Sequence, residues 1–177
     1  MTPTRTTLSA QARALRDAFD GAFAAPLPEP PPPAVALLVV RAGEELVAIR
    51  RTEMTGFARC ENLVPTPGCS PAFLGLAGLR DGVHPVWDLA NLLGHPAASA
   101  PPRWLVLAEA QPGEPCALAC ADFERLVFVS AGAITGAARE EPGAVADGLA
   151  PWGSALVRIV NLPALLTSLR SQVGNRQ

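Results

Sequence analysis

The sequence contains no lysine and no tyrosine, so all 14 basic residues are arginines. The absence of lysine excludes a Walker-A lysine and a lysine Schiff base, and the absence of tyrosine excludes a tyrosine acid or nucleophile. Charge is also sparse: charged residues make up 17% of the chain, below the roughly 25% of an average soluble protein, and the formal net charge is −2. This composition argues against a nucleic-acid-binding protein, which would carry clustered basic side chains.

Long hydrophobic runs are absent as well. No stretch approaches the roughly 18 apolar residues of a membrane span, and residues 1–25 carry charges instead of the apolar core of a signal peptide. We therefore expect a cytoplasmic protein that is not inserted into a membrane. The cysteines lack the spacing of a zinc site, and no metal or other cofactor is predicted. In a reducing cytoplasm we expect free thiols at Cys60, Cys69, Cys116 and Cys120.

Residues 1–33 are expected to lie outside the main domain. Apolar residues recur at three- and four-residue steps between Ser9 and Phe23, which predicts an amphipathic helix with Ser9 as its N-cap. The proline-rich run 26–33 follows, and because proline lacks a backbone N–H this run suits neither a helix nor a paired strand. We interpret it as a polyproline-II linker of about 25 Å. Recognition of the run by a proline-reading module is the alternative.

After the linker, short β-type runs separated by turn signals dominate the sequence. Apolar runs at 35–40 and 46–49 flank a turn, and further runs follow at 83–87, 104–107, 116–121, 126–129 and 156–160. Short helices are expected at 88–93 and 162–169, with Asp88 and Asn161 at their N-cap positions. Many short strands with few helical segments predict a mainly β fold of antiparallel barrels or a sandwich.

An internal repeat divides this β region into halves. Residues 87–93 and 160–166 share the order apolar, Asp or Asn, Leu, two variable positions, Leu, Leu. Each copy follows an apolar strand and closes a half of similar length. The repeat predicts two related lobes, at 35–95 and 104–170, joined by the proline- and alanine-rich stretch 96–102. Residues 34–170 would then form one domain, followed by a flexible C-terminal tail at 171–177.

Few residues suggest chemistry. His84 and Asp88 lie four residues apart and could orient a nucleophile, but the sequence contains no Gly-x-Ser-x-Gly elbow. A small metal-binding or hydrolytic module that uses His84, Asp88 and the cysteines is kept as an alternative. Arg80 lies in a turn between Gly78 and Gly82, and its planar guanidinium makes several directed hydrogen bonds, which is typical of a partner contact. The residues therefore favour an interaction module over an enzyme.

The stretch from Pro65 to Leu89 resembles the signature of CheW-like domains. The family pattern runs proline–glycine, apolar–glycine, leucine–arginine–glycine and proline–valine–x–aspartate–leucine. The sequence matches it, in order, at Pro67-Gly68, Leu74-Gly75, Leu79-Arg80 and Pro85-Val86-Trp87-Asp88-Leu89. The resemblance extends over about residues 35–169. Two positions differ from the pattern, since Gly78 stands where the family has asparagine and Asp81 where it has glycine.

The resemblance implies two SH3-like five-stranded β-barrel lobes packed together, with no catalytic residues and no cofactor. CheW-like domains are adaptors between chemoreceptors and the CheA histidine kinase: the first barrel pairs with the kinase's regulatory domain, and a groove between the barrels accepts the receptor's hairpin tip. We therefore expect a non-enzymatic scaffold of a bacterial chemosensory pathway, for chemotaxis or for pilus or gliding motility, associated with membrane-bound receptor arrays. A divergent relative that binds only one partner, as a competitor or regulator, is the alternative.

The resemblance also implies which residues bind partners. Leu79, Arg80, Val83 and Pro85 belong to the arginine motif or follow it directly. Many relatives carry valine–x–glutamate–isoleucine where this chain has Met54-Thr55-Gly56-Phe57, so the acidic residue is replaced by Gly56. The partner-binding residues expected on this basis are Arg80, Leu79, Met54, Phe57, Val83 and Pro85.

Overall fold

The structure is a computed structural model that describes residues 13–17, 19, 34–66, 70–96, 100–136 and 145–174. The chain divides into two units, Met1–Pro31 and Pro32–Gln177. In the first unit, residues 13–17 and 19 are helical. The remainder of the helix expected between Ser9 and Phe23, and the proline-rich run 26–33, lie outside the described residues.

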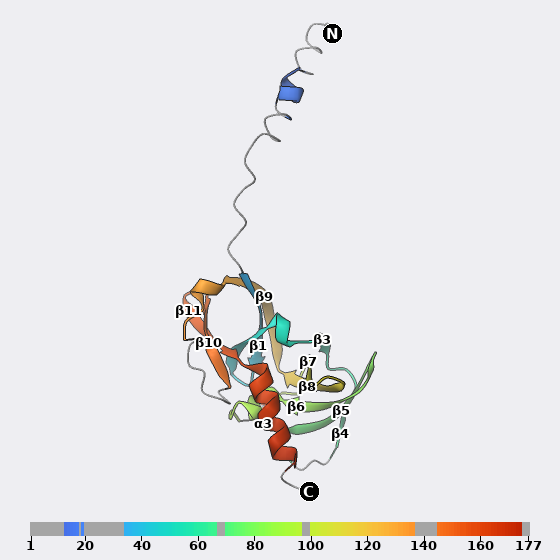
Figure 1. Ribbon diagram of the computed structural model, residues 1–177. Helices are drawn as coiled ribbons and strands as arrows, with labels where there is room; N and C mark the ends of the chain where they lie inside the picture. The colour runs from blue at the N-terminus through green and yellow to red at the C-terminus, as the bar shows by residue number, and fades with distance from the viewer. Residues whose placement is uncertain are drawn as a thin grey trace. The chain divides into compact units, whose positions relative to one another are not determined.

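The second unit is mainly β, as expected, and consists of two curled sheets (Figure 1). The first sheet has five strands, in the order β10 (Ala146–Trp152), β11 (Ala155–Val160), β2 (Glu45–Arg50), β1 (Ala34–Ala42) and β9 (Asp122–Ser130). The second sheet has six, in the order β3 (Gly56–Arg59), β7 (Trp104–Gln111), β8 (Glu114–Cys120), β6 (Gly82–Asp88), β5 (Phe73–Leu79) and β4 (Leu63–Pro65). The helices of this unit are α2 (Leu89–Leu92) and α3 (Leu162–Gly174), with 3-10 turns η1 (Arg51–Glu53) and η2 (Ala131–Ala133).

Each sheet combines strands from both halves of the chain. The first sheet takes the hairpin β1–β2 from the first half and β9, β10 and β11 from the second, whereas the second sheet takes the hairpin β7–β8 from the second half. Each of these two hairpins pairs with strands from the other half of the chain. The parallel contacts are those of β2 with β11 and of β8 with β6. The expected lobe boundaries, 35–95 and 104–170, therefore do not coincide with the two sheets. The repeat itself is visible, because β6–α2 and β11–α3 occupy equivalent places in the two sheets.

The central strands are buried on both faces, which explains why their sequences are continuously apolar instead of alternating. In β1, Leu37 and Val39 pack inside the curl of the first sheet, while Leu38 and Val40 enter the core between the sheets. Strand β8 behaves in the same way: Cys116, Leu118 and Cys120 join the inter-sheet core, and the alanines at 117 and 119 lie inside the second sheet. The domain thus has one core between the sheets and a smaller core inside each of them.

Both helices start at capped strand ends. The Asp88 carboxylate accepts a hydrogen bond from the backbone N–H of Ala90, 2.9 Å away, and the Asn161 side chain accepts one from Ala164 at 3.0 Å. Helix α3 fills the inter-sheet core with leucines at i, i+3, i+4 and i+7, namely Leu162, Leu165, Leu166 and Leu169. Its backbone continues to Gly174, so residues 171–174 are helical and do not form the tail expected from the sequence. Among the helices of the described residues, none has the length and apolar character needed to cross a membrane.

Candidate functional site

The arginine motif forms the tip of the β5–β6 hairpin. Leu79, the last residue of β5, pairs with Gly82, the first of β6, so Arg80 and Asp81 make the turn. The carboxylate of Asp81 lies 3.0 Å from Nε2 of the buried His84 and is therefore engaged by the histidine. Arg80 is exposed, and no carboxylate in the described part of the chain forms an ion pair with it. Its guanidinium is thus available to a partner.

The backbone geometry at Gly75 requires a glycine, which accounts for the apolar–glycine pair of the motif. Its φ is +138°, and a Cβ at this position would lie 2.1 Å from the carbonyl oxygen of Val64 in β4. Any larger residue would push β4 away from β5, because the clash is with backbone atoms. Glycine therefore allows Pro65 to pair with Gly75 and adds β4 to the edge of the second sheet.

The outward side chains of these strands form an apolar surface beside Arg80. Val64, Leu76 and Pro85 are direct neighbours across β4, β5 and β6, and Val83 follows on the same face of β6. Val64 is 63% exposed and Val83 66% exposed, large values for valine side chains. We call Val64, Leu76, Val83, Pro85 and Arg80 the hairpin face. Clustered exposed apolar side chains next to an unpaired arginine are typical of protein-binding surfaces.

Three other expected site residues have different positions. Leu79 is half-buried and packs against the core inside the second sheet, so it supports the turn that carries Arg80. Met54 is 7% exposed and belongs to the inter-sheet core, which leaves little of its side chain for a partner. Phe57 lies in β3, at the opposite edge of the second sheet from β4. Its ring stacks on Trp104 of β7 at 5.0 Å and lies 5.2 Å from Phe123 of β9, so this aromatic cluster links the two sheets.

Strand β9 extends apolar surface away from that cluster. Leu126 pairs with Leu38, which packs between the sheets, and Phe128 pairs with Ala36 on the same face. Leu126 is 43% exposed and Phe128 is 72% exposed. We call Phe57, Leu126 and Phe128 the junction face. Leu126 and Phe128 could not be singled out from the sequence, because the run 126–129 is apolar at every position and does not indicate which face is exposed.

Glu53, another residue that no sequence pattern indicated, fixes the segment next to Met54. Its carboxylate accepts a hydrogen bond from the backbone N–H of Leu162 at 3.1 Å, at the start of α3. Arg50 pairs with both Glu53 and Asp147 of β10. Burial raises the pKa of Glu53, and the Leu162 hydrogen bond and Arg50 oppose that shift. This cluster joins η1, the start of α3 and β10.

The residues of the alternative metal or hydrolytic module have structural roles. His84 bonds to Asp81 and not to Asp88, which caps α2. Burial raises the pKa of Cys116 to about 11 and that of Cys120 to about 12, so both thiols are protonated near neutral pH. Among the described residues, which exclude Cys69, no group of three His, Cys, Asp or Glu side chains is placed to hold a metal ion.

Comparison with known proteins agrees with the resemblance of the arginine motif. The family model of the CheW-like domain matches residues 36–170. Among solved structures, the fold is similar to that of the scaffolding protein TtCheW from Thermoanaerobacter tengcongensis, with a TM-score of 0.63 and 18% sequence identity, covering 75% of this chain and 92% of that chain. No curated protein matches the sequence. Because the family match spans most of the chain and the two curled sheets reproduce the fold of that scaffolding protein, the chain belongs to the CheW-like domain family.

Proposed function

We propose that this protein is a non-enzymatic scaffold that couples chemoreceptors to a CheA-type histidine kinase in a bacterial chemosensory pathway. The observation that carries the proposal is Arg80, exposed at the tip of the β5–β6 hairpin and free of a carboxylate partner in the described part of the chain. It matches the arginine of the family motif. The buried His84 holds the adjacent Asp81 at 3.0 Å, so Asp81 does not neutralise Arg80.

The hairpin face is the surface that we assign to the kinase's regulatory domain. A guanidinium makes directed hydrogen bonds to a partner's carbonyl or carboxylate oxygens, and the flanking valines exclude water from those bonds. Val64 and Val83 are both more than 60% exposed, so docking would bury apolar surface that now faces water. This combination supports a specific protein contact.

The junction face is the surface that we assign to the receptor's hairpin tip. Leu126 and Phe128 are exposed on β9, and Phe123 of the same strand packs on the stacked Phe57 and Trp104 at the joint between the sheets. The two faces involve opposite edges of the second sheet, β4 with β5 and β6 on one side and β3 on the other. One chain could thus hold kinase and receptor together at the cytoplasmic side of a receptor array.

The test starts from the tagged full chain purified from its native cells, with co-purifying kinase and receptor identified by mass spectrometry and then titrated individually. Arg80→Ala is expected to weaken kinase binding by about thirtyfold, the effect of losing roughly 2 kcal/mol from a buried arginine contact. Arg80→Lys should restore only part of the affinity, because an ammonium lacks the planar fork. Arg170→Ala, another exposed arginine, which pairs with Glu114, is the matched control and should bind normally.

The junction face is tested separately by Phe128→Ser. We expect weaker receptor binding with unchanged kinase binding and an unchanged thermal midpoint, because Phe128 is 72% exposed. Recovery of kinase alone or receptor alone would favour the alternative, a divergent family member that binds one partner as a competitor or regulator. Normal kinase binding by a folded Arg80→Ala variant would refute the assignment of the hairpin face.

A further inference from the structure

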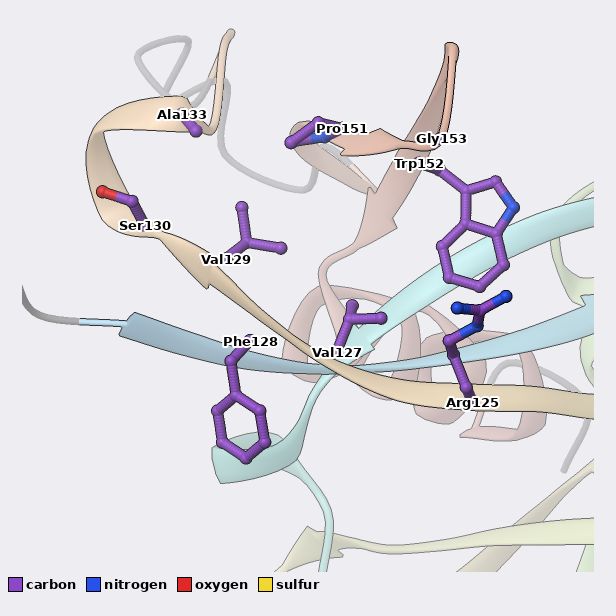
Figure 2. Close-up of a pocket in the computed structure, with 9 residues that line it drawn as sticks. All are labelled: Arg125, Val127, Phe128, Val129, Ser130, Ala133, Pro151, Trp152 and Gly153. Carbon is purple, nitrogen blue, oxygen red and sulfur yellow. The ribbon is translucent and has the colours of Figure 1, made fainter.

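A cavity of about 480 Å³ opens between β9 and β10 of the first sheet. Neither the hairpin face nor the arginine motif contributes to it, since both belong to the second sheet. Figure 2 shows Val127 and Val129 of β9 directed toward the space below Pro151, while the ring of Phe128 points the opposite way. The volume lies within the range of about 300–1,000 Å³ found for ligand pockets.

The walls of this cavity are largely apolar. Val127 and Val129 are also part of the core inside the first sheet, so the cavity is the open mouth of that core. Trp152 packs on the same core from β10, and Pro151 and Ala133 complete the rim. Binding of an apolar side chain in place of water is favourable in an apolar cavity of this kind.

One charged group stands at the rim. The guanidinium carbon of Arg125 lies 5.0 Å from the centroid of the Trp152 ring, in a cation–π contact that orients it (Figure 2). Across the residues that the structure describes, no carboxylate forms an ion pair with Arg125. A ligand for this cavity should therefore combine apolar groups with a negative charge.

The backbone around the cavity favours a peptide over a small molecule. Strands β9 and β10 are the two ends of the first sheet, so the side of β9 that faces away from β1 lacks a strand partner within the described residues. The outer edge of β10 is bridged at Leu149 by Thr135, and Pro151 offers it no N–H donor. An extended segment would thus pair with β9 and rest on Pro151 and Trp152.

We propose that the β9–β10 cavity binds an extended peptide segment of a partner protein, with alternating apolar side chains and an acidic residue that pairs with Arg125. The main chain of the peptide adds a strand to β9, alternate side chains enter between Val127 and Val129, and the carboxylate meets the guanidinium at the rim. This site is separate from the hairpin face and adjoins the junction face, since Phe128 also lines the cavity, and the proposal does not depend on the assignment of either face.

The test uses a phage-displayed library of random eight-residue peptides, selected on the full chain and counter-selected on Ala133→Trp, which fills the rim at an exposed position. Recovered peptides are synthesised and titrated by fluorescence anisotropy. We expect alternating apolar residues with an Asp or Glu, and a loss of about tenfold or more in affinity for Arg125→Gln, the effect of removing a charge-assisted hydrogen bond. Arg170→Gln is the matched control and should bind normally, and so should Arg80→Ala.

Hydrogen exchange supplies a second measurement that does not depend on the variants. Bound peptide should slow the exchange of β9 amides among residues 126–130, because the added strand pairs with them. The proposal is overturned if no peptide is enriched over the counter-selection, if the enriched peptides lack an acidic residue, or if Arg125→Gln binds them normally. Self-association in sedimentation experiments that Ala133→Trp abolishes would assign the cavity to a second copy of the chain and would also overturn it.

Discussion

The substitution Trp87→Ala tests the core that joins the two sheets. Trp87 is the penultimate residue of β6, is 8% exposed and lies in the inter-sheet core beside α2. Its ring centroid is 4.9 Å from that of Phe73, with the planes tilted by 58°. Truncating a buried tryptophan to alanine costs about 3–5 kcal/mol, of which the aromatic pair accounts for about 0.5–1.5 kcal/mol.

That loss is large against the total stability of a domain, which is about 5–15 kcal/mol. For a domain of this size, each 1 kcal/mol shifts the thermal midpoint by roughly 2–4 °C, so the midpoint should fall by roughly 6–20 °C. Urea unfolding followed by circular dichroism gives the free energy directly and shows whether the slope with denaturant is unchanged. Circular dichroism is the better probe here, because the substitution removes one of the three tryptophans that would report by fluorescence.

The matched control is Val83→Ala on the same strand. Val83 is 66% exposed, so its truncation should change the free energy of unfolding by no more than about 0.5 kcal/mol. If Trp87→Ala lost less than about 1 kcal/mol with an unchanged denaturant slope, the ring would not fill the inter-sheet core. Trp87 would then contribute little to the packing of β6 against α2.

Three further predictions follow from local geometry. Gly75→Ala should lower the free energy of unfolding in urea by about 2 kcal/mol or more, because φ is +138° and the new Cβ would lie 2.1 Å from the Val64 carbonyl oxygen. Gly78→Ala is the control and should change stability little, since no atom lies within 4 Å of its Cβ. Equal effects of the two substitutions would contradict the close approach of β4. Burial raises the pKa of Glu53 above its ordinary value of 4.5, so the folded state holds this proton more tightly and Glu53 lowers stability as the pH rises through that value. Glu53→Gln should therefore gain stability relative to the original chain as the pH rises above 4.5, and a difference that stays constant with pH would show that the carboxyl is not desolvated. Deleting residues 1–33 should leave the circular dichroism spectrum and thermal midpoint of the domain nearly unchanged, since the family match begins at residue 36; failure to fold would place part of that segment in the domain.

Local sequence patterns determined much of the secondary structure. Continuous apolar runs predicted the central strands β1, β2, β7 and β8, since a strand buried on both faces needs apolar residues at every position. Asp88 and Asn161 were recognised as N-caps because a helix start needs a side-chain acceptor at that point. The strands that were not predicted are β3, β4, β5 and β10, which are short or contain glycine or proline. All of them except β5 lie at sheet edges. Pairing with a neighbour stabilises such segments more than their own propensity does.

The exposure of only some of the expected site residues could be derived from the sequence. Arg80 was predicted to be available, and the motif placed it correctly in a turn, because a two-residue connection between paired strands leaves its side chains at the surface. Met54 and Phe57 were predicted from the same resemblance, but one is buried and the other is half-buried in a ring cluster. The exposure of Phe57 depends on its packing against Phe123 of β9 in the other sheet, which lies more than 60 residues further along the chain.

The sequence by itself determined the strand-rich class, the capped helices, the repeat and the family motif, because each of these depends on residues that are close together in the chain. The tertiary structure alone decided that the hairpins β1–β2 and β7–β8 exchange between the halves, and it alone created the junction face and the β9–β10 cavity. The physical reason is that an apolar strand can satisfy its backbone hydrogen bonds with any suitable neighbour. Which neighbour it takes is set by how the whole set of strands buries its apolar faces, and that choice leaves some edges and side chains exposed.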